Sequence, residues 1–196
     1  MTIISLKEIN KSRSKICLGN GTDFVLYKSE IKRYHISEGG ELSQQTYEEI
    51  IEEVLKPRCR SRALHLLEKQ DRTESSVRQK LKEGGYPSFL IDDAIDYLYS
   101  YHYLDDERYA KNYVRFHQDN KSKRRIANDL IAKGVSKAVI ETAIEVDYQS
   151  DEASQIEKLL NKKKYDRENA TEKDRAKMFR FLAYRGFSSE DIMKYI

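Results

Sequence analysis

The chain has 196 residues, of which 36 are Lys or Arg and 33 are Asp or Glu, so its formal net charge is only +3. This length excludes most large enzyme barrels, and the near balance of charge excludes a uniformly basic coat for nucleic acid. Hydrophobic residues make up 39% of the chain, and only two prolines and eight glycines interrupt it. The composition therefore favours an elongated helical assembly, which has a large surface relative to the size of its hydrophobic core.

The sequence predicts a cytoplasmic protein. No apolar run approaches the roughly 18 residues that span a bilayer, and the amino-terminal segment lacks the basic and apolar regions of a signal peptide. Cys17 and Cys59 show no metal-ligand spacing with any histidine, so we expect two reduced thiols. We expect no membrane contact, no metal and no cofactor.

The first 42 residues predict a small β-rich module. Two short strands are expected at 16–18 and 24–27, joined by a turn at Gly19-Asn20-Gly21, because Gly and Asn accept the positive φ of such turns. A third strand is expected within 3–9. This is too little material for an independent core, so we expect the module 1–42 to pack on the helices behind it.

A connecting helix is predicted over 43–57. Its apolar positions recur with the spacing of one helix face, and Pro57 is expected to end or kink the helix. These positions are Tyr47, Ile50, Ile51, Val54 and Leu55.

The rest of the chain contains an internal repeat aligned on Gly85, Gly134 and Gly186, which lie about 50 residues apart. A leucine stands four residues before each glycine and an isoleucine six residues after it. An apolar residue follows each glycine directly, and a Ser or Pro step comes next. The aligned residues are Leu81, Leu130 and Leu182 before the glycines, then Tyr86, Val135 and Phe187, then Ile91, Ile140 and Ile192.

These offsets predict how each unit is built. The glycine ends a helix in the left-handed conformation, the apolar residue after it packs back, and Ser or Pro starts the next helix. A preceding helix completes each unit, so three tandem three-helix repeats are expected at 58–104, 105–149 and 150–196. The predicted fold is mainly α, a curved array of repeats behind the β-rich module.

The middle repeat resembles a known family. Its Tyr103-Leu104-Asp105-Asp106-Glu107-Arg108-Tyr109-Ala110, the basic Lys121-Ser122-Lys123-Arg124-Arg125-Ile126, Leu130 and Lys133-Gly134-Val135 look like the signature of the RecX regulators of RecA recombinase. The resemblance covers roughly 58–196, and the β-rich segment is similar to an extension in some members. Ser122 stands where the family usually has glycine, which predicts a less tightly defined turn before Lys123.

The resemblance implies a regulator without enzymatic activity. Family members bind along the helical groove of RecA filaments on DNA and modulate, usually inhibit, the recombinase, which implies effects on its ATPase and co-protease activities in DNA repair, recombination and the SOS response. The implied partner is the RecA filament, with single- or double-stranded DNA as a further contact. Charged outer faces on the terminal repeats favour a monomer.

Three clusters of basic residues are the candidate contact sites for that partner. The second cluster in chain order, at residues 121–125, begins the middle helix of its repeat. Cations at that end of a helix oppose the helix dipole, so the placement of this cluster points to an anionic partner. The predicted contact residues are Lys121, Lys123, Arg124 and Arg125, then Arg58, Arg60 and Arg62, then Lys162, Lys163 and Lys164.

Two other classes of function stay open at this point. Helices joined by glycine turns also suggest a stand-alone helical DNA-binding module, although three copies of one turn are typical of an architectural device. A hydrolase is the weakest alternative, since no nucleotide-binding, metalloprotease or nucleophile motif is present. Asp105, Asp106 and Glu107 point in different directions around a helix, and we expect Asp105 or Asp106 to cap it. We predict no catalytic residue.

Overall fold

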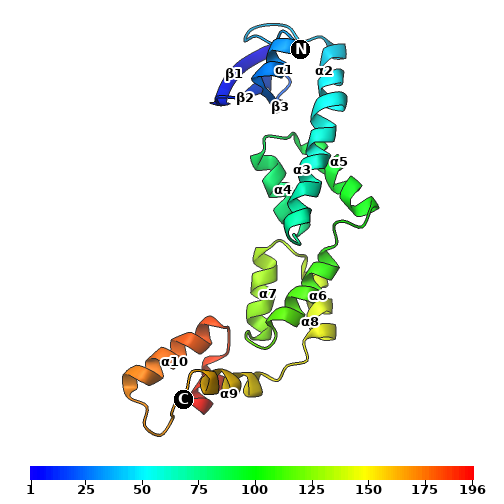
Figure 1. Cartoon of the computed structure of the whole chain (residues 1–196). Coiled ribbons are helices and arrows are strands. Elements are labelled where there is room, and N and C mark those ends of the chain that lie inside the picture. Colours follow the sequence, from blue (N-terminus) through cyan, green and yellow to red (C-terminus); the bar gives the residue numbers. More distant parts are fainter. The chain divides into compact units, whose positions relative to one another are not determined.

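The structure is a computed structural model that describes residues 1–196. The chain forms two compact units, Met1–Asp105 and Asp106–Ile196 (Figure 1). Both are mainly helical, and a small sheet belongs to the first unit. None of the helices combines the length and the apolar content that a membrane span requires.

The sheet is a three-stranded antiparallel meander in the order β1-β2-β3. Its strands are β1 (Ile3–Asn10), β2 (Arg13–Leu18) and β3 (Asp23–Tyr27). Alternate residues of β2 are buried, as expected for a sheet with one face on the core. The three predicted strands are confirmed, and β2 and β3 begin one to three residues earlier than the sequence indicates. The short helix α1 (Lys28–Arg33) follows β3 directly.

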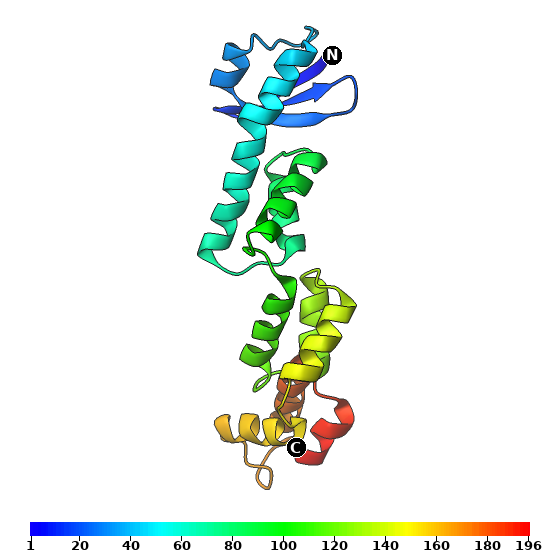
Figure 2. The same ribbon diagram turned by 90° about the vertical axis from the view of Figure 1, so that its right-hand side faces the viewer.

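One long helical stretch joins the sheet to the first repeat (Figure 2). It is made of α2 (Gln44–Glu49), a π-helical segment η1 (Ile50–Leu55) and α3 (Lys56–Lys69). The sequence predicts an end or a kink at Pro57, and the structure shows no end there, since the helical stretch continues through this residue. Pro57 lies in the first turn of α3, directly after the π-helical segment, where the wider hydrogen-bond pattern accommodates a residue that lacks an N–H.

The sheet and the helices behind it share a single core, as expected for a module too small to fold alone. Ile16, Phe24 and Leu26 of the sheet are fully buried in the same cluster as Ile50 and Leu55 of the long helical stretch. Figure 2 shows the sheet beside the first part of this stretch and two further helices beside the second part. The β-rich module is thus an integral part of the first unit.

The three tandem three-helix repeats are confirmed. In each, the second helix ends before its glycine, which has a positive φ of 82° at Gly85, 80° at Gly134 and 92° at Gly186. The leucines four residues earlier are completely buried. The helices are α3, α4 (Glu74–Glu83) and α5 (Ser88–Ser100), then α6 (Asp106–His117), α7 (Lys123–Ala132) and α8 (Lys137–Asp147), then α9 (Glu152–Lys162), α10 (Glu172–Tyr184) and α11 (Ser189–Tyr195).

Two of the glycine turns are packed tightly against the part of the chain that precedes them. A Cβ atom on Gly85 would lie 2.3 Å from Cγ2 of Val25 in β3, and one on Gly186 would lie 2.5 Å from the Ser122 hydroxyl. The Ser122 amide also donates to the carbonyl of Arg185 at 3.0 Å.

The curvature of the array and the domain boundaries at 42, 57, 104 and 149 stay predictions.

Candidate interaction surfaces

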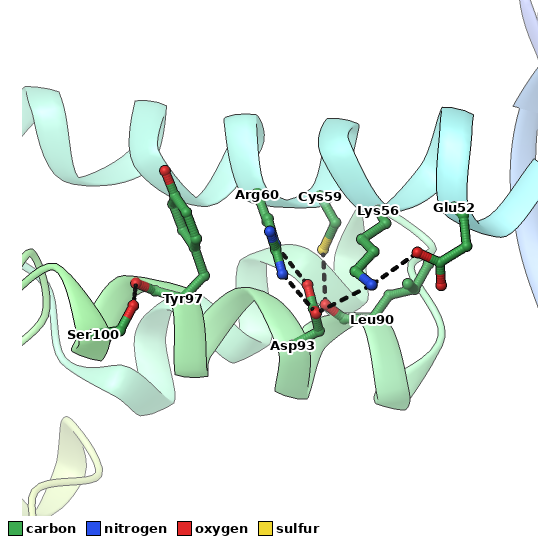
Figure 3. A network of polar contacts seen from close by, with 8 residues as sticks. All are labelled: Glu52, Lys56, Cys59, Arg60, Leu90, Asp93, Tyr97 and Ser100. Carbon is green, nitrogen blue, oxygen red and sulfur yellow. Dashed lines mark hydrogen bonds and ion pairs between the residues drawn. The ribbon is translucent and has the colours of Figure 1, made fainter.

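In the first basic cluster, at residues 58–62, Arg60 is bonded to other residues of the protein (Figure 3). Its guanidinium donates to both carboxylate oxygens of Asp93 on α5, at 2.7 Å and 2.8 Å, and lies over the ring of Tyr97. Lys56 adds an ion pair to Asp93 at 3.7 Å. The hydrogen bonds from Arg60 hold the pKa of the Asp93 carboxyl below its usual value. Arg60 therefore joins α3 to α5.

The other two arginines of this cluster differ from each other. Arg58 pairs with Glu30 of α1 and lies 4.8 Å over the ring of Tyr27, so it holds the long helix to the end of β3. Arg62 is exposed and makes no hydrogen bond, ion pair or ring contact within the chain. Of the three predicted contact residues in the first cluster, Arg62 is the one whose guanidinium can give all its hydrogen bonds to a partner.

In the second cluster, Lys121 and Arg125 both pair with Asp129 of α7, at 2.8 Å and 3.0 Å. Lys121 also donates to the hydroxyl of Tyr113 on α6. Partial burial favours the uncharged amine, but the bonds to Asp129 and Tyr113 outweigh it and raise the pKa of Lys121. The guanidinium of Arg125 lies 4.9 Å over the ring of Tyr184 on α10. These two cations stabilise the second unit from within.

The start of α7 is well defined despite the absence of the family's glycine. Ser122 is almost fully buried and its hydroxyl accepts from the Arg125 amide at 3.2 Å, which makes it the N-cap. A carboxylate oxygen of Glu152 accepts from the Lys123 amide at 2.9 Å and places negative charge at this helix end. The expected looser turn is therefore not found, and the cations here have an acidic counterpart from α9.

Lys123 and Arg124 remain exposed on the first turn of α7. The Lys123 ammonium lies 5.1 Å over the ring of Tyr148, whereas Arg124 makes no hydrogen bond, ion pair or ring contact within the chain. The third cluster is exposed throughout. Lys163 lies 5.1 Å over the ring of Phe181, and Lys162 and Lys164 have no such contact.

The structure thus divides the ten predicted contact residues by their surroundings. Four are paired with acidic side chains of the chain itself, and two are exposed above aromatic rings. The remaining four are exposed without an internal partner: Arg62, Arg124, Lys162 and Lys164.

Sequence reasoning missed one feature of the first unit. A cleft of about 610 Å³ lies where the sheet meets α3 and α4, and Arg58 and Arg62 share it with Arg13, Tyr27 and Lys80. Arg13 lies at the start of β2, far along the chain from α3, so only its position in the fold joins it to the cluster on α3. The pattern of charge along the chain contains no indication of this cleft.

The family models for all three repeats match the chain. The RecX first, second and third three-helix domains match residues 59–98, 105–144 and 150–196. These ranges follow the helices α3 to α5, α6 to α8 and α9 to α11.

Similar proteins and structures agree with this match. A regulatory protein RecX of Vibrio vulnificus is 39% identical over 136 residues, which are 68% of this chain and 88% of that protein. One of Clostridium botulinum is 30% identical over 204 residues, covering 99% and 92%. The crystal structure of a regulatory protein RecX superposes with a TM-score of 0.60 at 27% identity, covering 100% of this chain and 98% of that one. RecX from Lactobacillus salivarius gives 0.54 at 25% identity, covering 71% and 92%. The chain belongs to the RecX family of regulatory proteins.

Proposed function

We propose that this protein binds RecA filaments assembled on DNA and lowers their recombinase, ATPase and co-protease activities. The observation that carries the proposal is the match of all three repeats to a family of regulatory proteins named RecX. We infer from the family that the partner is a filament of RecA subunits and DNA. The protein acts by occupying a binding site and needs no chemistry of its own.

The exposed cations supply the contact that we propose. Four exposed cations have side chains that pair with no carboxylate of the chain. They are Lys123 and Arg124 on α7, Lys162 at the end of α9 and Lys164 just after it. Such cations attract an anionic surface at long range and make charge-assisted hydrogen bonds with carboxylates or phosphates at short range. Acidic side chains of RecA and phosphates of the bound DNA are both suitable acceptors.

The three repeats allow one chain to contact the filament at more than one point. Tandem repeats place exposed cations at several points along the chain, and a filament presents similar subunits at regular intervals. Several weak contacts made together bind far more tightly than any one alone. We infer that one chain, as a monomer, contacts more than one RecA subunit and thereby restricts the motions that accompany ATP hydrolysis.

The test is ATP hydrolysis by RecA on single-stranded DNA across a titration of this protein, with filament binding followed in parallel. Loss of hydrolysis at substoichiometric protein would support the proposal. Absence of both binding and inhibition would overturn it. Binding to bare duplex DNA at the same affinity as to filaments would favour the stand-alone DNA-binding module instead.

A matched pair of variants tests the contact residues. Lys123→Ala/Arg124→Ala removes two exposed cations and leaves the Lys121 and Arg125 bonds to Asp129 in place. Lys137→Ala/Lys173→Ala removes the same charge from exposed positions outside the three clusters. The first variant should bind filaments at least about tenfold more weakly, through two lost charge-assisted contacts, and the second should bind like the parent. Equal binding by the two variants would remove α7 from the contact surface.

A further inference from the structure

The cleft between the sheet and the first repeat has the size and the walls of a ligand site. Its volume of about 610 Å³ lies within the range of small-molecule sites. Its walls come from β2, the end of β3, α3, α4 and the turn at Gly84 and Tyr86. The close contact of Gly85 with Val25 brings that turn against β3, so the packing of the first unit fixes one wall.

The charges along the cleft leave two guanidinium groups without partners. Arg58 is paired with Glu30, and Lys80 is paired with Glu83 at 2.7 Å. Arg13 and Arg62 line the same cleft, and neither side chain makes a hydrogen bond or ion pair within the chain. The cleft therefore has two uncompensated positive charges. A terminal phosphate carries nearly two negative charges at neutral pH, and two successive phosphodiesters carry two.

An aromatic platform stands in the same cleft. Tyr27 is 42% exposed, and the guanidinium of Arg58 lies over its ring, 4.8 Å from the centroid. A flat base can stack on such a ring, and this contact does not depend on which base it is. Tyr86 adds a hydroxyl that is uncharged at neutral pH, and burial raises its pKa further, to about 12. An acidic peptide would satisfy the cations but would leave the aromatic platform without a flat ligand.

We propose that this cleft binds a nucleotide unit, with its phosphate held by Arg13 and Arg62 and its base stacked on Tyr27. The unit can come from a free mononucleotide or from a single-stranded nucleic acid, and both present the same phosphate and base. Binding needs no RecA, so this proposal stands or falls separately from the proposed function.

The test is isothermal titration of the whole protein with inorganic phosphate, thymidine 5′-monophosphate, an oligothymidine strand and a glutamate-rich peptide. At least one nucleotide ligand should bind about tenfold more tightly than inorganic phosphate, because the base adds a stacking contact. Tighter binding of the mononucleotide assigns the site to free nucleotides, and tighter binding of the strand assigns it to nucleic acid. Equal binding of phosphate and both nucleotide ligands, or equal binding of the peptide, would overturn the proposal.

Matched variants locate the site. Arg13→Ala/Arg62→Ala should weaken nucleotide binding at least about tenfold, because two charge-assisted contacts are lost. Lys69→Ala/Lys82→Ala removes the same charge from exposed positions on α3 and α4 outside the cleft, and should bind like the parent. Equal weakening by both pairs would show attraction to overall charge and would overturn the proposal. Arg62→Ala alone changes only an exposed side chain and should still weaken binding about threefold or more.

Substitutions of the ring separate stacking from charge. Tyr27→Leu should weaken the binding of nucleotides while leaving that of inorganic phosphate unchanged, and Tyr27→Phe should retain both. Unchanged nucleotide affinity in Tyr27→Leu would overturn the stacking role. If the parent protein lowers RecA hydrolysis but binds no nucleotide ligand, this proposal fails and the proposed function stands.

Discussion

Arg60 donates two hydrogen bonds to Asp93 across the α3–α5 interface, while Arg62, two residues later on the same helix, contacts no acid at all. Arg60→Ala should therefore lower the free energy of unfolding by about 1 kcal/mol, a value reduced by solvent screening because the two side chains are 36% and 25% exposed. Arg62→Ala should leave it unchanged. Urea denaturation of both variants measures the difference. Equal stabilities would mean that the Arg60 contact contributes nothing to folding.

Gly21, in the turn between β2 and β3, and Gly85, in the turn after α4, permit a comparison at nearly the same φ. Gly21 and Gly85 have φ values of 83° and 82°, but a Cβ at Gly21 meets nothing within 4 Å and one at Gly85 meets Val25 at 2.3 Å. Gly21→Ala should cost about 1 kcal/mol through the backbone alone. Gly85→Ala should cost about 2–4 kcal/mol, since it also forces the sheet away from the turn.

Urea denaturation again provides the measurement for the two alanine variants. Similar losses at the two glycines would show that the sheet moves freely away from the turn. In that case the Gly85–Val25 contact would not determine how the sheet packs on the first repeat.

The two thiols should differ in reactivity. Cys59 is buried, its Sγ lies 3.4 Å from the Leu90 carbonyl oxygen, and burial raises its pKa to about 12. Cys17 is only half-buried. Because the thiolate is the reactive form, iodoacetamide at about pH 8 should label Cys17 at least about tenfold faster than Cys59. Mass spectrometry of peptides follows both sites, and unfolding in urea should equalise them. Fast labelling of Cys59 in the folded protein would contradict its burial.

Stability should decrease on mild acidification because of His117. Burial, and then the nearby Lys121, lower the pKa of His117 below its ordinary value of 6.5. As the pH falls below 6.5 the unfolded chain binds the proton first, so the free energy of unfolding decreases until the folded protein is protonated too. Above 6.5 this contribution is complete.

Substitution of His117 tests whether this residue causes the loss of stability at low pH. His117→Gln should reduce the difference in melting temperature between about pH 7.5 and about pH 5.5. His65→Gln, at an exposed position on α3, serves as the control and should keep the parent's difference. An unchanged difference in His117→Gln would assign the pH dependence to other groups.

The repeats were predictable because each one uses the same mechanical device. A glycine with positive φ, a buried leucine before it and an apolar residue after it recur in every copy, and these are properties of neighbouring residues. The π-helical segment before Pro57 was not predictable, since it depends on which carbonyl each amide finds and not on the apolar spacing.

The contact residues were harder to judge from sequence. A cation beside an acid looks the same in a sequence as one without a partner, because the acid can come from far along the chain. Asp93 lies 33 residues after Arg60, and Glu30 lies 28 residues before Arg58. Arg13 reaches the cleft from a strand for the same reason. Only tertiary structure separates cations that stabilise the fold from those available to a partner.

The backward packing of the glycine turns has a consequence for synthesis on the ribosome. Gly85 contacts Val25, and Gly186 contacts Ser122 and Arg125, so each of these turns meets a surface that has already been translated. Chains that fold as they emerge acquire their amino-terminal structure first. The surface on which each of these turns packs is therefore already folded when the turn is synthesised. We expect the nascent protein to fold from its amino-terminal end onward, before its last residues are made.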